Sequence, residues 1–138
     1  MMVFALQNYT DVFKALSDET RLRLLYLLTT AKKELCCCEL TDSLEEPLYN
    51  VSRQLKILKN AELVVSRKEG KWVYFSLTKN RDAFTKGIFN TIASLPHTDR
   101  MKKDQENLKE ILLMREEGKC LHGVLKKTSF KTKKMSPH

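Results

Sequence analysis

Two short helical patterns joined by a tight connection constrain the fold of this chain more than any other feature. Residues 36–44 predict a helix of barely two turns, and Pro47 stands at the start of a second helix that ends near Ala61. The second helix has a buried stripe at positions i, i+4 and i+7, formed by Val51, Leu55 and Leu58. Two short helices connected this tightly are typical of a helix-turn-helix.

A β-hairpin is predicted immediately after these helices. Two β-rich runs within residues 64–77 flank Glu69-Gly70, where glycine can take the positive φ of a tight turn. A hairpin in this place is a wing. Further amphipathic helices are expected at residues 8–16, 19–29, 80–95 and 101–117. The sequence therefore predicts a mainly α fold with a β-hairpin wing (α+β), a winged helix-turn-helix.

Charge is unevenly distributed along the 138 residues. Residues 1–100 carry 15 basic and 12 acidic side chains, a net of +3, and residues 101–138 carry 10 and 5, a net of +5. We expect a winged-helix DNA-binding and dimerisation domain over residues 1–100 and a C-terminal helix over 101–118. Residues 119–138 are expected to form a disordered basic tail that either attracts phosphates or has no role.

Cysteine usage favours a reducing cytoplasm. The four cysteines form no spaced disulfide framework, and the chain shows neither a signal peptide nor an apolar run long enough to span a bilayer. Three of the four stand together at Cys36, Cys37 and Cys38, where the first helix of the helix-turn-helix is expected to begin. Such clusters are typical of metal or redox chemistry, although free cysteine is also a common buried apolar residue.

Four segments, in order, resemble the ArsR/SmtB family of winged-helix metalloregulators. They are residues 13–22 (FKALSDETRL), 34–40 (ELCCCEL), 51–55 (VSRQL) and 67–73 (RKEGKWV), within a similarity that covers about residues 8–95 without gaps. The resemblance implies a homodimeric repressor that leaves its operator when a metal or metalloid binds. The chain is most similar to the arsenic sensors, whose first helix-turn-helix helix opens with a Cys-x-Cys pair, here Cys36 and Cys38.

The resemblance and the thiol chemistry together indicate As(III) as the inducer, with Sb(III) as a chemical mimic and no organic cofactor. Arsenite is thiophilic, and thiolates are the ligands that select soft ions. The Asp, His and Glu pairs of the family's zinc sensors are absent, as are the N-terminal cysteines of its cadmium and lead sensors. Thr41 occupies the position where arsenic sensors commonly carry a third cysteine. The third ligand therefore stays open between Cys37, Cys120 and two-coordinate binding.

The geometry of an ideal helix suggests how such a site would act. Successive residues advance by about 100°, so Cys36 and Cys38 would lie about 200° apart. One ion could bind both sulfurs only if the first turn of the helix distorted. That distortion would reach the second helix of the helix-turn-helix and couple inducer binding to DNA release.

The predicted DNA-binding face lies opposite the buried stripe of the second helix. The residues expected to contact DNA there and on the wing are Tyr49, Asn50, Ser52, Arg53, Gln54, Lys56, Arg67, Lys68 and Lys71. Arg53 suits a guanine, whereas Asn50 and Gln54 suit adenine. The serine and the lysines suit phosphates, and the wing cations suit phosphates or the minor groove. The same side chains would also suit a solvated face, but the neighbouring wing favours DNA.

A homodimer is expected to form through the first and fifth helices. Val12 on residues 8–16, and Phe84, Ile88 and Ile92 on residues 80–95, are more apolar than a small core needs. A two-fold dimer matches operator half-sites about 34–36 Å apart, or a multiple of that spacing.

We therefore expect a transcriptional repressor that binds double-stranded operator DNA and releases it when As(III) binds the cysteine cluster. The alternative is a thiol-based redox sensor, in which the cluster forms a strained and easily reduced disulfide. A winged-helix module for protein contacts alone would leave the thiols unexplained. The sequence has no phosphate loop, nucleophile elbow or spaced carboxylate pair, so neither enzyme activity nor a membrane partner is expected.

Overall fold

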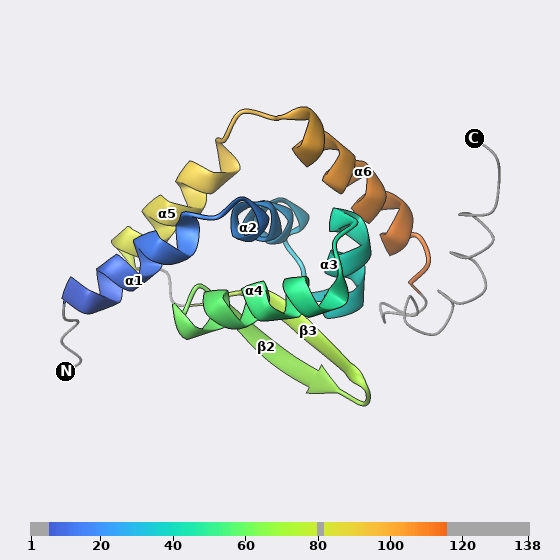
Figure 1. The fold of residues 1–138 in the computed structure, drawn as a ribbon, viewed down its shortest axis with the longest axis horizontal. Coiled ribbons are helices and arrows are strands. Elements are labelled where there is room, and N and C mark those ends of the chain that lie inside the picture. The colour runs from blue at the N-terminus through green and yellow to red at the C-terminus, as the bar shows by residue number, and fades with distance from the viewer. Residues whose placement is uncertain (1–5, 80–81, 116–138) are drawn as a thin grey trace.

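The computed structural model describes residues 6–79 and 82–115, which form six α-helices and one three-stranded antiparallel sheet (Figure 1). The elements are, in chain order, α1 (Leu6–Leu16), α2 (Glu19–Ala31), β1 (Leu35–Cys36), α3 (Cys37–Leu44), α4 (Leu48–Asn60), β2 (Val64–Glu69), β3 (Trp72–Leu77), α5 (Ala83–Ala93) and α6 (Asp99–Leu112). The mainly α fold with a hairpin wing is confirmed. Among the described residues, no helix is long and apolar enough to cross a membrane.

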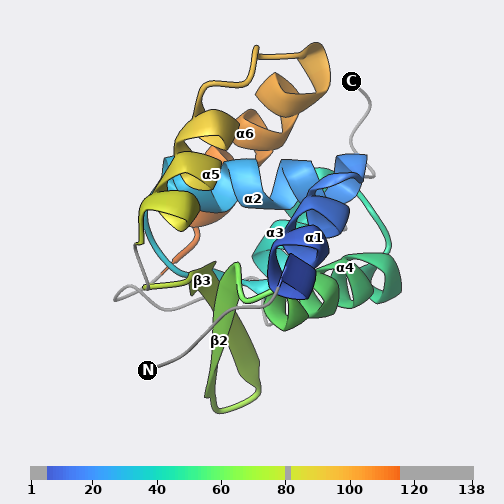
Figure 2. The same cartoon turned by 90° about the vertical axis from the view of Figure 1, so that its left-hand side faces the viewer.

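α2 forms the centre of the fold because the other five helices and β3 lie around it. It contacts α1, α3, α4, α5, α6 and β3, and Figure 2 shows it lying between α5 and α6 on one side and α4 on the other. Its side chains from residue 24 to residue 28 are all buried. The predicted stripe of α4 joins the same core with no exposed surface at Val51, Leu55 and Leu58. The helix-turn-helix is thus held by the main hydrophobic core.

Polar side chains fix where three of the helices begin. Asp18, Asp82 and Thr98 each accept a hydrogen bond from the backbone N–H three residues further along the chain. These caps satisfy N–H groups that have no partner inside a helix. They explain why α5 begins at Ala83 rather than near residue 80, and why α6 begins at Asp99 rather than Met101.

The wing sheet contains a strand that the sequence pattern did not predict. The hairpin of β2 and β3 is confirmed, with Gly70 at φ +61° in its turn, and it projects away from the helices (Figure 2). β1 pairs antiparallel with the other side of β3, with Leu35 opposite Phe75 and Cys36 opposite Tyr74. Cys36 therefore belongs to the wing sheet, and α3 begins one residue later than expected.

α6 packs along α3 and contacts both of its ends. At the C-terminal end of α3, Asn107 donates to the carbonyl oxygen of Ser43 at 2.9 Å, and Arg100 donates to that of Leu44. Such carbonyls have no partner within their own helix. Arg115, just beyond α6, reaches the N-terminal end of α3. A buried ion pair, Arg23 Nε to Asp104 Oδ2 at 2.8 Å, ties α6 to α2 as well.

Candidate nucleic-acid interface and thiol site

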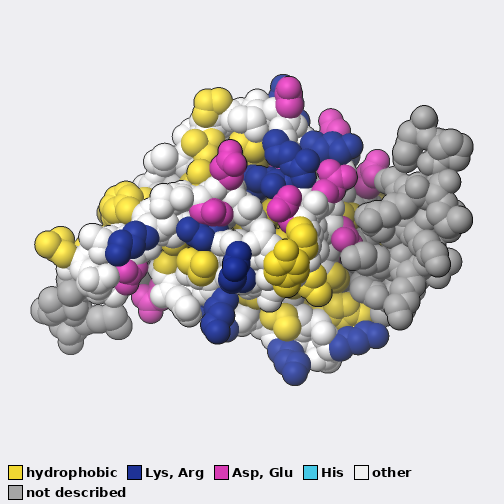
Figure 3. Space-filling view, in the orientation of Figure 1, with side chains coloured by type: hydrophobic (Ala, Val, Ile, Leu, Met, Phe, Trp, Pro, Cys, Tyr) yellow, Lys and Arg dark blue, Asp and Glu magenta, His cyan; other side chains and the backbone are white. Residues whose placement is uncertain are grey.

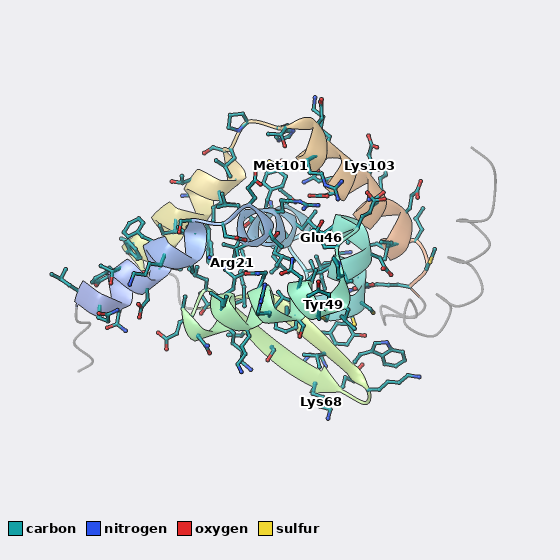
Figure 4. All side chains as sticks on the ribbon, viewed as in Figure 1. Arg21, Glu46, Tyr49, Lys68, Met101 and Lys103 are labelled. Carbon is teal, nitrogen blue, oxygen red and sulfur yellow. The ribbon has the colours of Figure 1, made fainter. Side chains whose placement is uncertain are left out.

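α3 and α4 form the helix-turn-helix, and the exposed side of α4 and the wing share one face of the molecule. Figure 3 shows lysine and arginine side chains spread over this region, in the lower half of the view. Seven of the nine predicted DNA-binding residues are exposed, namely Tyr49, Ser52, Arg53, Lys56, Arg67, Lys68 and Lys71. Figure 4 shows Tyr49 on α4 and Lys68 on the wing pointing toward this side. The structure therefore brings most of the predicted set together.

Gln54 is corrected from a base-contacting residue to a buried one. Its side chain is only 6% exposed, because it lies on the side of α4 that faces α2. Its Oε1 accepts a hydrogen bond from Arg21 Nη1 at 2.5 Å, and its Nε2 donates to Asn50 Oδ1 at 3.0 Å. Both halves of the amide already have partners within the chain, so Gln54 is not placed to contact adenine.

Arg67, which the sequence predicts to be a wing cation that contacts DNA, is exposed and is also paired within the chain. Its guanidinium donates to both carboxylate oxygens of Glu34, the shortest distance being 2.7 Å, and to Glu69 at 3.0 Å. The hydrogen bonds from Arg67 hold the pKa of Glu34 below its ordinary value. Two carboxylates therefore lie beside the charge of Arg67.

The sulfur atoms of Cys36 and Cys38 lie side by side and form a pair. Their Sγ atoms lie 3.2 Å apart, and Cys36 is 2% exposed beside Tyr74 of β3. The expected angle of about 200° between the two side chains is wrong, because Cys36 is the N-cap of α3, with an extended backbone (φ −69°, ψ 148°). Two thiolates that share one ion at about 2.3 Å, the zinc–thiolate distance, can lie at most about 4.6 Å apart. The pair is thus already close enough to bind one ion.

Cys37 is not brought to this pair. Its side chain packs against the main hydrophobic core, and this burial raises the pKa of its thiol. Across the part of the chain that the structure describes, no three side chains of histidine, cysteine, aspartate or glutamate form a metal-binding group. Cys120, the other predicted candidate, lies outside the described residues.

Glu39 holds the backbone at Cys36, a role that the sequence pattern did not indicate. Its Oε1 accepts the backbone N–H of Cys36 at 2.8 Å, and its two oxygens accept Arg115 at 2.6 and 2.8 Å. Arg115 also donates to the carbonyl oxygen of Glu34 and lies over the ring of Tyr74. The only local signal is the three-residue spacing from Cys36 to Glu39, which is that of a capping box. The segment just beyond α6 thereby contacts the segment that carries the thiols.

Comparisons with known proteins agree with this arrangement. Residues 18–66 match the family model described as "Bacterial regulatory protein, arsR family". The arsenical resistance operon repressor of Escherichia coli K12 is 38% identical over 80 residues, which cover 58% of this chain and 68% of that protein. The cadmium resistance regulator CadC homolog of Staphylococcus aureus is 45% identical over 76 residues, 53% of this chain and 62% of that protein. The arsenic resistance transcriptional regulator ArsR1 of Pseudomonas putida is 42% identical over 81 residues, which cover 56% of this chain and 62% of that protein.

Among solved structures, HlyU from Vibrio cholerae N16961 has a TM-score of 0.56 and 27% identity, covering 66% of this chain and 94% of that one. The matched part thus spans slightly less than two thirds of two of the sequence relatives and nearly all of this structural neighbour. The family and the fold are those of DNA-binding transcription regulators. The chain belongs to the ArsR family of bacterial regulatory proteins.

Proposed function

We propose that this chain is a dimeric transcriptional repressor that binds operator DNA and releases it when As(III), or its mimic Sb(III), binds Cys36 and Cys38. The observation that carries the proposal is the sulfur pair, 3.2 Å apart, with one sulfur on the wing sheet and the other on α3. Soft thiolates select soft ions, and free thiols persist in a reducing cytoplasm, which we propose as the compartment. Relatives named for arsenical resistance support an arsenic-type inducer.

The position of the pair gives a route from the inducer to both DNA-contacting elements. Cys36 lies opposite Tyr74 in the sheet whose other strand, β2, carries Lys68. Cys38 lies in the first turn of α3, which packs against α4. An ion bound to both sulfurs therefore links the wing sheet to α3. A further ligand that moves this ion shifts the wing and the recognition helix relative to each other, and DNA contacts both at once. This is a coupling between two sites through two packed elements.

The third sulfur is proposed to come from Cys120 rather than Cys37. Because the two sulfurs already lie close together, the binding of one ion to them alone changes little in the first turn of α3. Arg115 donates to Glu39, which accepts the backbone N–H of Cys36. Cys120 follows Arg115 by five residues in the sequence. Five residues span at most about 17 Å, which sets the limit on how far the sulfur of Cys120 can reach from Arg115. A third bond to Cys120 would alter the contact between α6 and α3, and two-coordinate binding would not.

Redox sensing remains a second candidate because of the same sulfur pair. A disulfide has an S–S distance of about 2.05 Å, so Cys36 and Cys38 need to approach by little more than 1 Å. Titration of the operator complex with arsenite under reductant, and separately with peroxide, distinguishes the two. Release by arsenite alone supports the proposed function, whereas release by peroxide alone supports the redox candidate.

The dimer is proposed to form through α1 and α5, but by a different set of residues than the sequence pattern indicated. Val12 and Ile92 are buried within their own chain. The large apolar side chains that α1 leaves exposed are Leu6 at 80% and Phe13 at 56%. The ring of Phe13 also contacts that of Phe84 on α5 edge to face, with 5.8 Å between the ring centroids. Hydrophobic side chains gather at this end of the molecule in Figure 3. A surface of this kind is suited to a second copy of the chain.

We expect Phe13→Asp to shift the protein from dimer to monomer. A charge at the centre of an apolar contact costs several times more than an exposed charge, because it must lose water without gaining a partner. Sedimentation equilibrium at micromolar concentration measures the shift. Lys14→Asp is the control, because it changes the next residue of α1 and alters the charge by more than Phe13→Asp does. Wild-type protein that sediments as a monomer with and without DNA would contradict the dimer.

We expect Arg53 and Lys68 to contribute to DNA binding in different ways. Arg53→Ala should weaken operator binding by about 1–3 kcal/mol and relax the preference at one base pair, because a guanidinium contacts guanine through two hydrogen bonds. Lys68→Ala should weaken operator and scrambled DNA equally and reduce the salt slope by about 1. Fluorescence anisotropy over a range of salt concentrations separates the two effects. Identical behaviour of both variants on both DNAs would refute the assignment.

A further inference from the structure

A hydrogen-bonded network runs from α2 to the DNA-binding side of α4. Arg21 Nη1 donates to Gln54 Oε1 at 2.5 Å, and Gln54 Nε2 donates to Asn50 Oδ1 at 3.0 Å. Arg53 Nη2 donates to the same Oδ1 at 3.2 Å from the exposed side. Arg21 lies between α2 and α4 in Figure 4. We call these four residues the amide network.

Arg21 fixes the direction of the whole amide network. A guanidinium has donors and no acceptor, so the oxygen of Gln54 must face it and the nitrogen must face Asn50. Arg21 is itself anchored, because its Nε donates to the carbonyl oxygen of Ala15 at 2.7 Å. Gln54 is buried, so water cannot supply the hydrogen bonds that its amide would need if it were flipped. The direction of the first hydrogen bond therefore determines that of the second.

Asn50 is consequently fixed from both sides. Gln54 Nε2 and Arg53 Nη2 both donate to its Oδ1, and a carbonyl oxygen has two lone pairs, so its acceptor capacity is filled. No described residue accepts a hydrogen bond from Asn50 Nδ2. Recognition of adenine by asparagine needs both atoms, since the oxygen accepts from adenine N6 while the nitrogen donates to N7. With its oxygen occupied, Asn50 has only donors to offer to a base.

We infer that Arg21, which does not contact DNA itself, sets base specificity by making Asn50 a pure hydrogen-bond donor that favours guanine over adenine in the major groove. Guanine presents two adjacent acceptors there, N7 and O6, and Arg53 beside Asn50 is also a pure donor. The residue type alone allowed Asn50 to recognise adenine, and the network removes that option. The inference rests on the proposed function of operator binding.

The sharpest test reverses the direction of the network with Gln54→Glu. A carboxylate still pairs with Arg21, but its second oxygen can only accept, so Asn50 must turn its Nδ2 inward and its Oδ1 outward. The operator is first selected from a random pool of duplex DNA with wild-type protein, and Asn50→Ala identifies the base pair that Asn50 faces. At that pair, the dissociation constant for the adenine duplex is divided by that for the guanine duplex, and the inference puts this ratio above one in wild type. In Gln54→Glu the ratio should be lower by at least about fivefold.

Three further variants make the result interpretable. Gln105→Glu adds the same charge on α6 and should leave the ratio unchanged. Gln54→Met keeps the size but removes both hydrogen bonds, so it should bring the ratio toward one without favouring adenine. The third variant is Asn50→Asp. Asn50 is half-buried and lies outside the core, so this substitution does not disturb the core. Its carboxylate can still accept from Gln54 and Arg53 but has no donor, so it should lose the guanine preference even if Gln54→Glu does not fold.

The outcomes separate this inference from the proposed function. Wild-type protein that selects no sequence from the pool contradicts operator binding and, with it, the inference. Selection of a defined operator that has adenine at the position faced by Asn50 contradicts the inference alone. So does an unchanged ratio in Gln54→Glu, provided that its circular dichroism spectrum and thermal midpoint match those of Gln105→Glu.

Discussion

Cys36→Ser and Cys38→Ser are each expected to leave operator affinity within about twofold of wild type and to abolish release by arsenite. Serine keeps the size of cysteine but lacks the thiolate that soft ions require. Neither side chain belongs to the exposed set on α4 and the wing, since Cys36 is buried and packs with Tyr74, and Cys38 packs against the same cluster. Anisotropy of a labelled operator, titrated with arsenite in the presence of reductant, measures the release.

Single variants at the other two cysteines serve as controls and identify the third sulfur. Cys37 lies against the main core, so Cys37→Ser should lower stability slightly and leave the arsenite response intact. Cys120→Ser should weaken the response by tenfold or more if Cys120 supplies the third ligand, and should have no effect if two sulfurs suffice. A Cys36→Ser/Cys38→Ser double variant that still releases DNA on arsenite addition would exclude the metalloid mechanism.

The same titration can be repeated with Sb(III), Cd(II) and Zn(II), since the relatives include a protein named for cadmium resistance. Two sulfurs 3.2 Å apart suit any thiophilic ion, and the selectivity must therefore come from the number and geometry of further ligands. Release by As(III) and Sb(III) at lower concentrations than by Cd(II) would support a small pyramidal thiolate site. The reverse order would indicate a cadmium sensor instead.

Periodicity was sufficient to predict the architecture around the recognition helix. The stripe of Val51, Leu55 and Leu58 and the hairpin around Gly70 depend on local spacing and local backbone conformation, and both were confirmed. β1 was missed because a strand of two residues has no period, and its pairing with β3 joins residues about forty positions apart. Cys36 therefore changed from a helical residue to a strand residue, and the geometry of the thiol site changed with it.

The electrostatic partners of the site could not be predicted, because their contacts are long-range. Arg67 and Gln54 have the composition of DNA-binding residues, yet each pairs with a residue 33 positions earlier, Glu34 and Arg21 respectively. Residue type gives the chemistry that a side chain can perform. Only the fold decides whether another group in the same chain already uses that chemistry.

The contact between Arg115 and Glu39 gives the second large effect that we expect, on stability. Glu39 has no exposed surface, and removal of one partner of a buried ion pair leaves an uncompensated charge. Arg115→Met should therefore lower the free energy of unfolding by about 3–5 kcal/mol, whereas the double variant Arg115→Met/Glu39→Gln should recover part of that loss. Urea denaturation followed by circular dichroism measures both. Lys103→Met is a suitable control, because this lysine also lies on the α6 segment but its side chain is exposed.

The same variants test whether α6 is connected to the thiol site. Glu39 accepts the backbone N–H of Cys36, so loss of Arg115 should also loosen the backbone under the sulfur pair. We expect Arg115→Met to change the arsenite concentration for half-release by severalfold at a temperature where the protein is fully folded, and Lys103→Met not to change it. If Arg115→Met lowers stability but leaves half-release unchanged, the contact stabilises the fold without taking part in the switch. If stability is also unchanged, the ion pair between Arg115 and Glu39 contributes nothing to the folded state, and the contact of α6 with α3 rests on its other side chains.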